Sequence, residues 1–240
     1  MVGRKLFIAI PSYDFKVTLK FAISLARFAQ VAPMHGIEFQ IGSICGCSVV
    51  SRARNLLVDQ FLNSDCTDLL FIDADINFEP SDVLRLMAWT STYAIAGGVP
   101  RARKEEKTYI ATLEADADKN IMMNSMGLVR VIRLATAFMM VQRQVFEKLI
   151  EAHPEWQYFD EKYAENGKTL FSVFDFKSTP EGYIGEDFLF CDRARELGFT
   201  VWVDPTIKLG HMGVTEYMGD FGNEYLYPML KPIEPTSEVA

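Results

Sequence analysis

Short apolar runs alternate along the first hundred residues with longer segments whose apolar residues recur at helical spacing. A run of four to eight apolar residues between turn residues is typical of a buried strand, whereas spacings of three and four are typical of an amphipathic helix. Strands are predicted at residues 5–10, 37–44, 68–75 and 93–100, and helices at residues 17–32, 51–63 and 79–90. Regular alternation of strand and helix predicts a parallel sheet with helices on both faces.

The pattern changes after residue 104. Residues 107–115 and 128–142 predict two strands joined by a hairpin-like connection. Helices are predicted at residues 143–153, directly after the second of these strands, and at residues 185–198. A further strand is predicted at residues 200–206, "TVWVDPT". The fold class expected from the whole pattern is α/β, with a mixed, mainly parallel central sheet flanked by helices.

The helix at residues 51–63 is expected to begin at Ser51, which would cap it. The stretch between residues 154 and 183 is long, polar and aromatic. A loop of that length inside a compact domain is often a functional lid.

Composition narrows the range of functions. The 240-residue chain is 49% hydrophobic, which allows a large core, and its formal net charge is −8. An acidic chain lacks the basic face that nucleic-acid binding needs, so no nucleic acid is expected as a partner. Four cysteines without a C-x-x-C pair argue against zinc and for free thiols in a reducing compartment. The apolar run before Pro11 is too short for a signal peptide or a transmembrane segment, so a soluble, cytoplasmic protein is expected.

Two Asp-x-Asp tripeptides occur, and their contexts differ. Asp116-Ala117-Asp118 lies in the polar stretch "EADADKN", which predicts a solvated turn. Asp73-Ala74-Asp75 follows a buried apolar run, where the carboxyl end of a strand is the usual ligand site of an open α/β sheet. Side chains alternate along a strand, so Asp73 and Asp75 would point the same way and could hold Mg²⁺ or Mn²⁺. A simple strand end followed by a turn would explain the same residues.

Further carboxylates, a histidine and two basic clusters complete the candidate chemistry. Glu186 and Asp187 open a predicted helix, where acidic residues are common for electrostatic reasons alone, although a carboxylate there could also act as a general base. His211 lies between two glycines and is either a structural residue or a third metal ligand. The basic clusters are Arg52 with Arg54, and Arg101 with Arg103 and Lys104; each could hold phosphate or simply be solvated.

The order of these segments is more specific than any one of them. "IAIPSYD", "SRARNLLVDQFLNSDCTDLLFIDADINFEP", "AIAGGVPRARK", "ATAFMMVQRQVFEKL" and "GYIGEDFLFCDRARELGFTVWVDPTIKLGHMG" follow one another between residues 5 and 213. This set resembles the GT-A fold glycosyltransferases, in particular the broad family-2-like group with bacterial and viral members. The resemblance implies a Rossmann-like GT-A fold in a single catalytic domain over residues 1–240. A nucleotide-binding half would cover about 1–104 and an acceptor-binding half about 105–213, followed by a C-terminal tail at 214–240.

The resemblance also assigns roles to individual residues. Asp187 would be the catalytic base of an inverting transfer, with Glu186 beside it in contact with the acceptor. The metal, Mn²⁺ or Mg²⁺, would be held by Asp73, Asp75 and His211, with Asp75 the main ligand. The nucleotide-sugar donor, UDP- or GDP-linked, would be bound by Pro11, Ser12, Tyr13, Asp14, Arg52, Arg54, Asp73, Ala74, Gly98 and Arg101.

The resemblance says less about the acceptor and about the donor sugar. The aromatic stretch from Trp156 to Tyr183 would cover a carbohydrate acceptor, whether glycan, glycoprotein or glycolipid. Contact with a membrane surface is expected only if that acceptor is a lipid. Ala135-Thr136-Ala137 stands where many relatives carry a Gly-Thr-Gly-type stretch beside the donor sugar, so the added methyl groups alter the sugar pocket.

Two rival interpretations stay open on the sequence. A degenerate GT-A domain would bind nucleotide or glycan without transfer. A haloacid-dehalogenase-like phosphatase also uses an Asp-x-Asp, but there it normally ends the first strand, whereas two strands precede Asp73 here. The oligomeric state cannot be read from the sequence.

Overall fold

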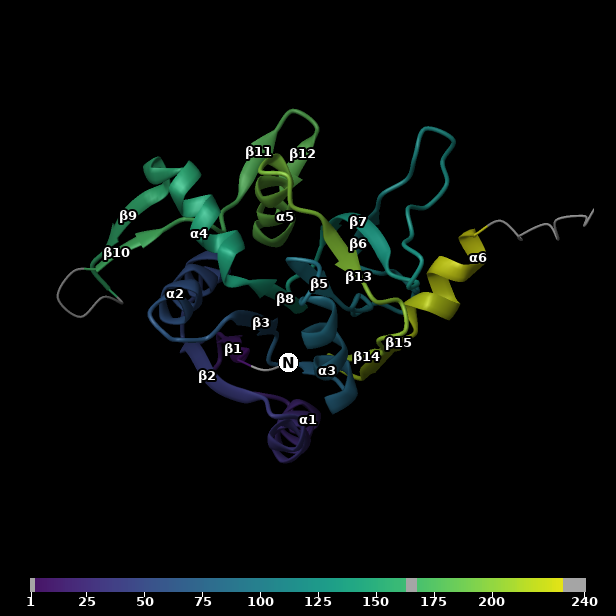
Figure 1. Ribbon diagram of the computed structural model, residues 1–240, viewed down its shortest axis with the longest axis horizontal. Coiled ribbons are helices and arrows are strands. Elements are labelled where there is room, and N and C mark those ends of the chain that lie inside the picture. Colours follow the sequence, from purple (N-terminus) through teal and green to yellow (C-terminus); the bar gives the residue numbers. More distant parts are fainter. Residues whose placement is uncertain (1–2, 163–167, 231–240) are drawn as a thin grey trace, which may run out of the picture.

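An eight-stranded sheet forms the centre of the protein, with helices packed on both faces (Figure 1). The computed structural model describes residues 3–162 and 168–230. The strand order is β2-β1-β3-β8-β5-β13-β7-β6, and only β8 and β7 run against the common direction. The strands are β1 (Lys5–Ser12), β2 (Glu38–Cys45), β3 (Asp68–Ile72), β5 (Ile95–Gly97), β6 (Ala111–Leu113), β7 (Val129–Leu134), β8 (Phe138–Gln142) and β13 (Val201–Val203).

Two apolar clusters bury the two faces of this sheet. Phenylalanines from α1 (Leu19–Val31) and from the segment before α3 (Pro80–Trp89) pack on one face. The other face is covered by α2 (Val50–Leu62), α4 (Arg143–Ala152) and α5 (Glu186–Glu196). Strand β3, apolar apart from Asp68, is buried along its whole length because helices cover both of its faces, as its sequence predicts. The predicted mixed, mainly parallel sheet is confirmed.

Two details differ from the sequence-based expectation. Ser51 does not cap α2, because the helix already begins at Val50 and its N-cap, Val49, makes no side-chain hydrogen bond. The single strand expected at residues 128–142 is two strands, β7 and β8, separated by a turn at Ala135-Thr136-Ala137. Both run in the same direction, but β7 pairs with β13 and β6, whereas β8 fits between β3 and β5. An apolar run cannot show that its two halves bury themselves against different neighbours.

The stretch between α4 and α5 contains two short hairpins. They are β9 (Gln157–Asp160) with β10 (Lys168–Phe171), and β11 (Lys177–Thr179) with β12 (Gly182–Ile184). Both hairpins project from the α2, α4 and α5 side of the sheet (Figure 1). Residues 163–167 of the predicted lid lie outside the described residues. The stretch is therefore more structured than the loop expected from its composition.

A small second sheet joins the Asp-x-Asp segment to the C-terminal region. It consists of β4 (Ile76–Asn77), β14 (Leu209–Met212) and β15 (Glu216–Gly219), with β14 in the middle. The pairing of His211 with Ile76 places the histidine directly beside the end of the Asp-x-Asp turn.

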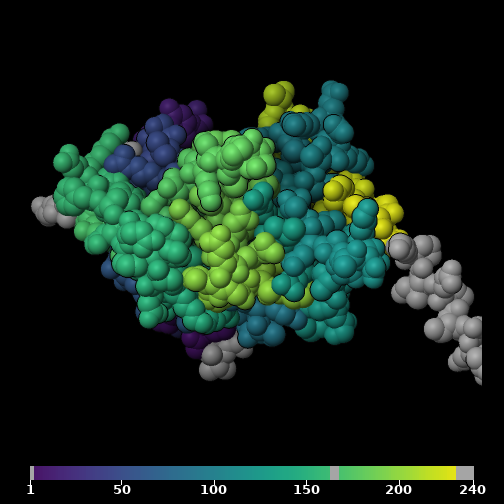
Figure 2. All heavy atoms as spheres, turned by 90° about the horizontal axis from the view of Figure 1, so that it is seen from above, coloured from purple at the N-terminus to yellow at the C-terminus, as the bar shows by residue number. Residues whose placement is uncertain are grey.

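After β15 the chain forms a π-helical turn (Gly222–Leu226) and a short helix, α6 (Tyr227–Met229). Phe221 and Leu226 are buried, and the ring of Tyr109 packs against Phe221. Figure 2 shows this segment, in yellow, seated against the teal part of the chain. Within residues 3–162 and 168–230, none of the helices has the length and apolarity needed to cross a membrane.

Candidate active site

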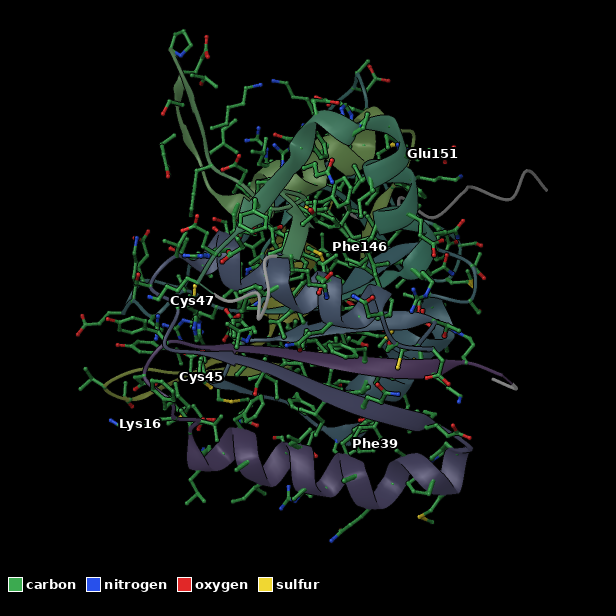
Figure 3. The ribbon with its side chains drawn as sticks, turned by 90° about the vertical axis from the view of Figure 1, so that its left-hand side faces the viewer. Lys16, Phe39, Cys45, Cys47, Phe146 and Glu151 are labelled. Carbon is green, nitrogen blue, oxygen red and sulfur yellow. The ribbon has the colours of Figure 1, made fainter. Side chains whose placement is uncertain are left out.

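A cleft of about 710 Å³ opens at the carboxyl ends of β1 and β3. These two strands are parallel neighbours, so the loops that follow them leave the sheet at the same edge. Figure 3 shows Lys16, Cys45 and Cys47 gathered toward this end of the sheet. The cleft is lined by Pro11, Ser12, Tyr13, Asp14, Lys16, Val17, Thr18, Ile44, Cys47, Ser48, Val50, Ala53, Arg54, Asp73, Ala74, Asp75 and Arg103.

The loop after β1 forms one wall of the cleft. The Ser12 hydroxyl donates a hydrogen bond to the Lys16 carbonyl at 2.7 Å, which closes the loop on itself. Tyr13 is 68% exposed and so presents a free aromatic ring beside the cleft. The Thr18 side chain accepts from the Phe21 amide and caps α1. This wall combines an aromatic ring with polar groups, which suits a planar base and a ribose.

Arg54 lies at the centre of the site, and it is almost completely buried. Its Nε donates to Glu186 at 3.1 Å and its Nη2 lies 3.3 Å from Asp73. Burial alone would lower the pKa of Arg54, but Asp73 and Glu186 outweigh burial and leave the pKa above its ordinary value. The guanidinium therefore stays charged and joins the Asp-x-Asp turn to the start of α5 across the sheet.

Asp187 stands next to this charge network without a direct ion pair to Arg54 among the contacts found in the described chain. Its Oδ1 accepts from the amide of the next residue, Phe188, at 2.7 Å. Burial, and then the charge of Glu186, raise the pKa of Asp187 to about 6. A carboxylate with such a pKa is a better proton acceptor near neutral pH than an ordinary aspartate.

Asp75 faces His211 and Arg103 at the opposite wall. The Arg103 Nη1 lies 2.7 Å from the Asp75 Oδ2, and the His211 Nε2 lies 3.6 Å from the same oxygen. The His211 Nδ1 lies 2.8 Å from the Arg101 carbonyl oxygen, which can only accept, so Nδ1 carries the proton. Neutral His211 then directs the lone pair of Nε2 at the Asp75 carboxylate, an arrangement that calls for a cation between the two.

The pKa shifts of Asp75 and His211 are those expected if a positive charge is stabilised between the two side chains. Burial raises the pKa of Asp75, but His211 and Arg103 lower it by more, so the pKa is below its ordinary value. Burial lowers the pKa of His211, but Asp75 and the Arg101 carbonyl more than compensate, so its pKa is raised. A proton fills the gap between the two side chains at low pH, and a metal ion could replace it.

Asp73 does not join this pair. The strand ends at Ile72, and residues 73–75 form a turn in which the Ile76 amide donates to the Asp73 carbonyl. The alternation expected for a strand therefore does not apply, and the two carboxylates have different partners, Arg54 and Arg103. No group of three histidine, cysteine or acidic side chains in the described parts of the chain is close enough to hold a metal by itself.

Three of the predicted donor-binding residues lie elsewhere than in the lining of the cleft. Arg52 forms an ion pair with the buried Asp160, with its Nε 2.6 Å from the carboxylate, and so fastens the β9–β10 hairpin to α2. Gly98 packs against Ile207, where an added Cβ would come within 2.7 Å of a side-chain carbon. The Arg101 guanidinium bonds to backbone carbonyls, including that of Glu105 at 2.7 Å.

Several lining residues had no signal in the sequence. Lys16, Cys47 and Ser48 carry no motif, and Arg103 belonged to a basic cluster in which no single member stood out. Their positions depend on how the segments that follow β1, β2 and β5 fold over the edge of the sheet. All four cysteines of the chain are free thiols, as predicted.

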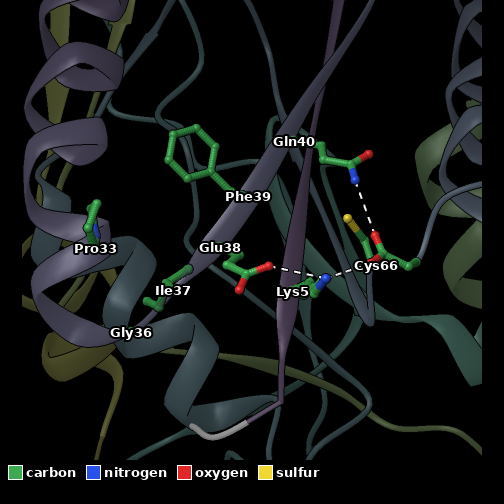
Figure 4. A pocket seen from close by; sticks show the side chains of 9 residues that line it. Lys5, Pro33, Gly36, Ile37, Glu38, Phe39, Gln40 and Cys66 are labelled. Carbon is green, nitrogen blue, oxygen red and sulfur yellow. Dashed lines mark hydrogen bonds and ion pairs between the residues drawn. The ribbon is translucent and has the colours of Figure 1, made fainter.

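A second hollow, of about 620 Å³, lies at the opposite, amino-terminal ends of β1 and β2 (Figure 4). Its lysine, Lys5, is already paired with Glu38 and Asp65. This hollow is lined by one cation and two carboxylates, whereas the cleft at the other end of the strands is lined by three cations and three carboxylates.

Comparison with known proteins supports the fold. No family model matches the sequence, and no curated protein matches it either. Among solved structures, A197 from STIV aligns over 88% of this chain and 86% of its own, with a TM-score of 0.52 and 21% identity. GalNAc-T7 with UDP, GalNAc and Mn²⁺ aligns over 88% and 44% of the two chains, with a TM-score of 0.49 and 11% identity. S. aureus TarS 1-349 with UDP-GlcNAc aligns over 83% and 56%, with a TM-score of 0.43 and 13% identity. The chain shares the fold of A197 from STIV, and its mixed, mainly parallel sheet flanked by helices is the Rossmann-like GT-A architecture that its ordered sequence segments predict.

Proposed function

We propose that this protein is a metal-dependent glycosyltransferase that moves a sugar from a UDP- or GDP-linked donor to a hydroxyl acceptor. The observation that carries the proposal is the convergence of four separate segments of the chain. Arg54, Asp73 and Asp75 line the cleft. Arg54 also pairs with Glu186, the neighbour of Asp187, and His211 faces Asp75. Each segment has a plain structural explanation alone. Together they supply a candidate base, a buried cation and a candidate metal pair at a cleft of nucleotide size.

The donor nucleotide would lie along the loop after β1. Pro11, Ser12, Tyr13 and Asp14 line this end of the cleft, and the exposed Tyr13 ring offers a face for the base. Arg103 lies beside Asp75, where it can also neutralise a diphosphate. The division into a nucleotide-binding half before residue 105 and an acceptor-binding half after it remains part of this proposal.

Asp75 and His211 fit a divalent metal. One carboxylate oxygen and one imidazole nitrogen face each other, and the other imidazole nitrogen is held by a backbone carbonyl, as is usual for a metal-binding histidine. With only two such side chains converging in the described chain, the diphosphate, water or Asp73 would supply the other ligands. When bound, Mn²⁺ or Mg²⁺ supplies positive charge against the leaving diphosphate.

Asp187 is assigned as the catalytic base. Its raised pKa suits removal of a proton from an acceptor hydroxyl, while Glu186 is held by Arg54 and can contact the acceptor. The deprotonated hydroxyl then attacks the anomeric carbon as the bond to the diphosphate breaks, which inverts that carbon. Arg54 keeps Glu186 and Asp73 in fixed positions on either side of the reacting centre.

The sugar would sit near the turn between β7 and β8. The Ala137 carbonyl accepts from the Asp73 amide at 3.1 Å, so this turn adjoins the Asp-x-Asp segment. Thr136 is fully buried, and its hydroxyl is one of the buried polar groups without a hydrogen-bond partner in the described structure. Ala135 and Ala137 are buried too, so the turn forms a tight wall rather than an open pocket.

The acceptor would be a carbohydrate that approaches from the side of the two hairpins. The rings of Phe176 and Tyr183 stack with 5.6 Å between their centroids, and Tyr183 is 68% exposed. Tyr183 lies four residues before Asp187. An exposed aromatic face so close to the base suits a sugar ring, and such patches commonly mark binding sites.

A donor screen tests this function. The purified protein is incubated with Mn²⁺ and UDP-, GDP-, dTDP- and CMP-sugars, and released nucleotide is measured beside an Asp75→Ala control. Slow, metal-dependent hydrolysis of one donor that is absent from the control is the expected result. Tight binding of a nucleotide sugar without release, even with a panel of glycan acceptors, would favour a binding domain without transferase activity. If no nucleotide bound at all, the proposed function would be wrong.

A further inference from the structure

The edge strand β2 presents an unusual surface. All eight of its residues pair with β1 in uninterrupted parallel register, and within the described chain no strand pairs with its other side. Its sequence, "EFQIGSIC", has neither proline nor a basic residue, and its one charge, Glu38, stands at the start. Proteins usually protect long edge strands with such residues or with bulges, because a bare edge is a template for another strand.

An apolar groove of about 440 Å³ runs along this strand on the side of α1. Ile41, Ser43 and Cys45 of β2 form one wall of the groove. Three alanines of α1 lie along the groove at helical spacing, Ala22, Ala26 and Ala29. Their small side chains leave the groove open, so Ile41 remains 51% exposed although it lies on the helix-covered face of the sheet.

Other apolar side chains extend the surface. Phe15 is 75% exposed, Val17 is 46% exposed, and both line the same groove. Ile23, one residue along α1 from the groove, is 42% exposed. A free strand edge bordered by an apolar patch is incomplete in two ways, because it lacks backbone partners and because it leaves a contiguous apolar surface in water.

We propose that a second copy of this chain adds its own β2 antiparallel to this edge, which forms a two-fold dimer with one continuous sheet. The unpaired backbone groups call for a strand, since a helix or a small apolar molecule would leave them without partners. A second copy also offers the apolar surface needed to cover the groove, from the same residues on its own β2 and α1.

The sequence of β2 is compatible with pairing to itself. Residues directly opposite each other in an antiparallel pair lie on the same face, so the two-fold axis must pass midway between one residue of β2 and the same residue of the partner. With the axis at Ile41, this residue meets the partner's Ile41 in the groove, and Phe39 meets the partner's Ser43. Glu38 then lies opposite the partner's Ile44, so no like charges face each other.

Light scattering on the purified chain measures the first consequence. The expected mass at high concentration is twice the 27.2 kDa of one chain, with a fall toward one chain mass on dilution. A single chain mass at the highest soluble concentration would overturn the proposal.

Charge swapping at Ile41 tests the register. Ile41→Lys and Ile41→Glu should each weaken dimerisation at least tenfold, because like charges then meet at the axis. An equal mixture of the two variants should recover the dimer, since lysine then faces glutamate. Dimers that persist in both single variants, or a mixture that stays monomeric, would contradict this pairing.

A matched control separates the edge from the general surface. Val214 is also an exposed β-branched residue, but it lies between β14 and β15 of the small second sheet, whereas β2 belongs to the central sheet. Val214→Lys should leave the dimer unchanged, and loss of the dimer in this variant would also count against the proposal. Thermal unfolding shows whether each variant is folded. Substitutions at Ile41 should be tolerated, because its side chain is exposed.

Discussion

The same tripeptide, Asp-Ala-Asp, occurs twice in this chain with opposite physical roles. Asp73-Ala74-Asp75 is half-buried at the end of β3, and each carboxylate is met by an arginine from a distant segment. Asp116-Ala117-Asp118 is exposed in a turn. There the Asp116 Oδ1 accepts from the amides of Asp118 at 2.9 Å and Asn120 at 2.8 Å.

The difference lies in what compensates each negative charge. In the turn, backbone amides of the next few residues and water are sufficient, so the segment needs nothing from the rest of the fold. At the end of β3, burial makes the carboxylates costly unless cations approach from elsewhere in the chain. Partners from other segments of the chain therefore distinguish the proposed functional pair from the local turn.

The largest expected effect comes from removing one carboxylate of each pair. Asp75→Ala should reduce metal-dependent donor turnover about 1,000-fold, because it removes both a metal ligand and the partner of His211. Asp118→Ala should change turnover by less than about twofold, as is usual for an exposed turn residue. Equal losses in the two variants would abolish the distinction drawn between the segments.

The next effect concerns Asp187, the carboxylate at the start of α5 that is proposed as the base. Asp187→Asn should lower transfer to an acceptor by about 100-fold or more while donor binding remains, since only the proton acceptor is lost. Isothermal titration with the nucleoside diphosphate serves as the control for an intact cleft. If this variant transferred sugar at the wild-type rate, Asp187 would not be the base and another residue would have to accept the proton.

A smaller effect is expected in the pH profile. Because the pKa of Asp187 is about 6, kcat/KM should fall tenfold for each pH unit below 6 and level off above it. Glu186→Gln removes a neighbouring negative charge, so the ionised form of Asp187 becomes easier to form and its pKa falls. The acid limb of the profile should then shift to lower pH, and a shift to higher pH would contradict the proposed coupling.

The smallest effect belongs to the exposed turn and affects stability alone. Asp116→Ala removes the hydrogen bonds to Asp118 and Asn120 and should lower the free energy of unfolding by about 1 kcal/mol. For a chain of this size, that loss corresponds to a decrease in Tm of about 2–4 °C, measurable by calorimetry. Turnover should remain that of the wild type. A large loss of activity here would indicate that this segment reaches the substrate.

Much of the fold could be predicted from the sequence because it depends on local patterns. The first three strands and their helices follow from apolar runs and helical spacing, and α5 ends before Gly198, whose φ of 86° lies in the left-handed region. The break between β7 and β8 could not be predicted, because residues 128–142 read as one apolar run whose halves join different neighbours. The ion pair between Arg52 and Asp160 could not be predicted either, because nothing in the sequence shows that these two residues come into contact.

The sequence by itself determined the alternating architecture and the candidate chemistry, because periodicity and residue type are local properties. Asp73, Asp75, Asp187 and His211 were therefore identifiable as candidates one by one. Only the tertiary structure decided which of them meet: Arg54 joins Asp73 to Glu186, and β14 brings His211 to Asp75. Such charge compensation joins segments far apart in the sequence, as Arg54 and Glu186 show, so it exists only once the sheet has formed.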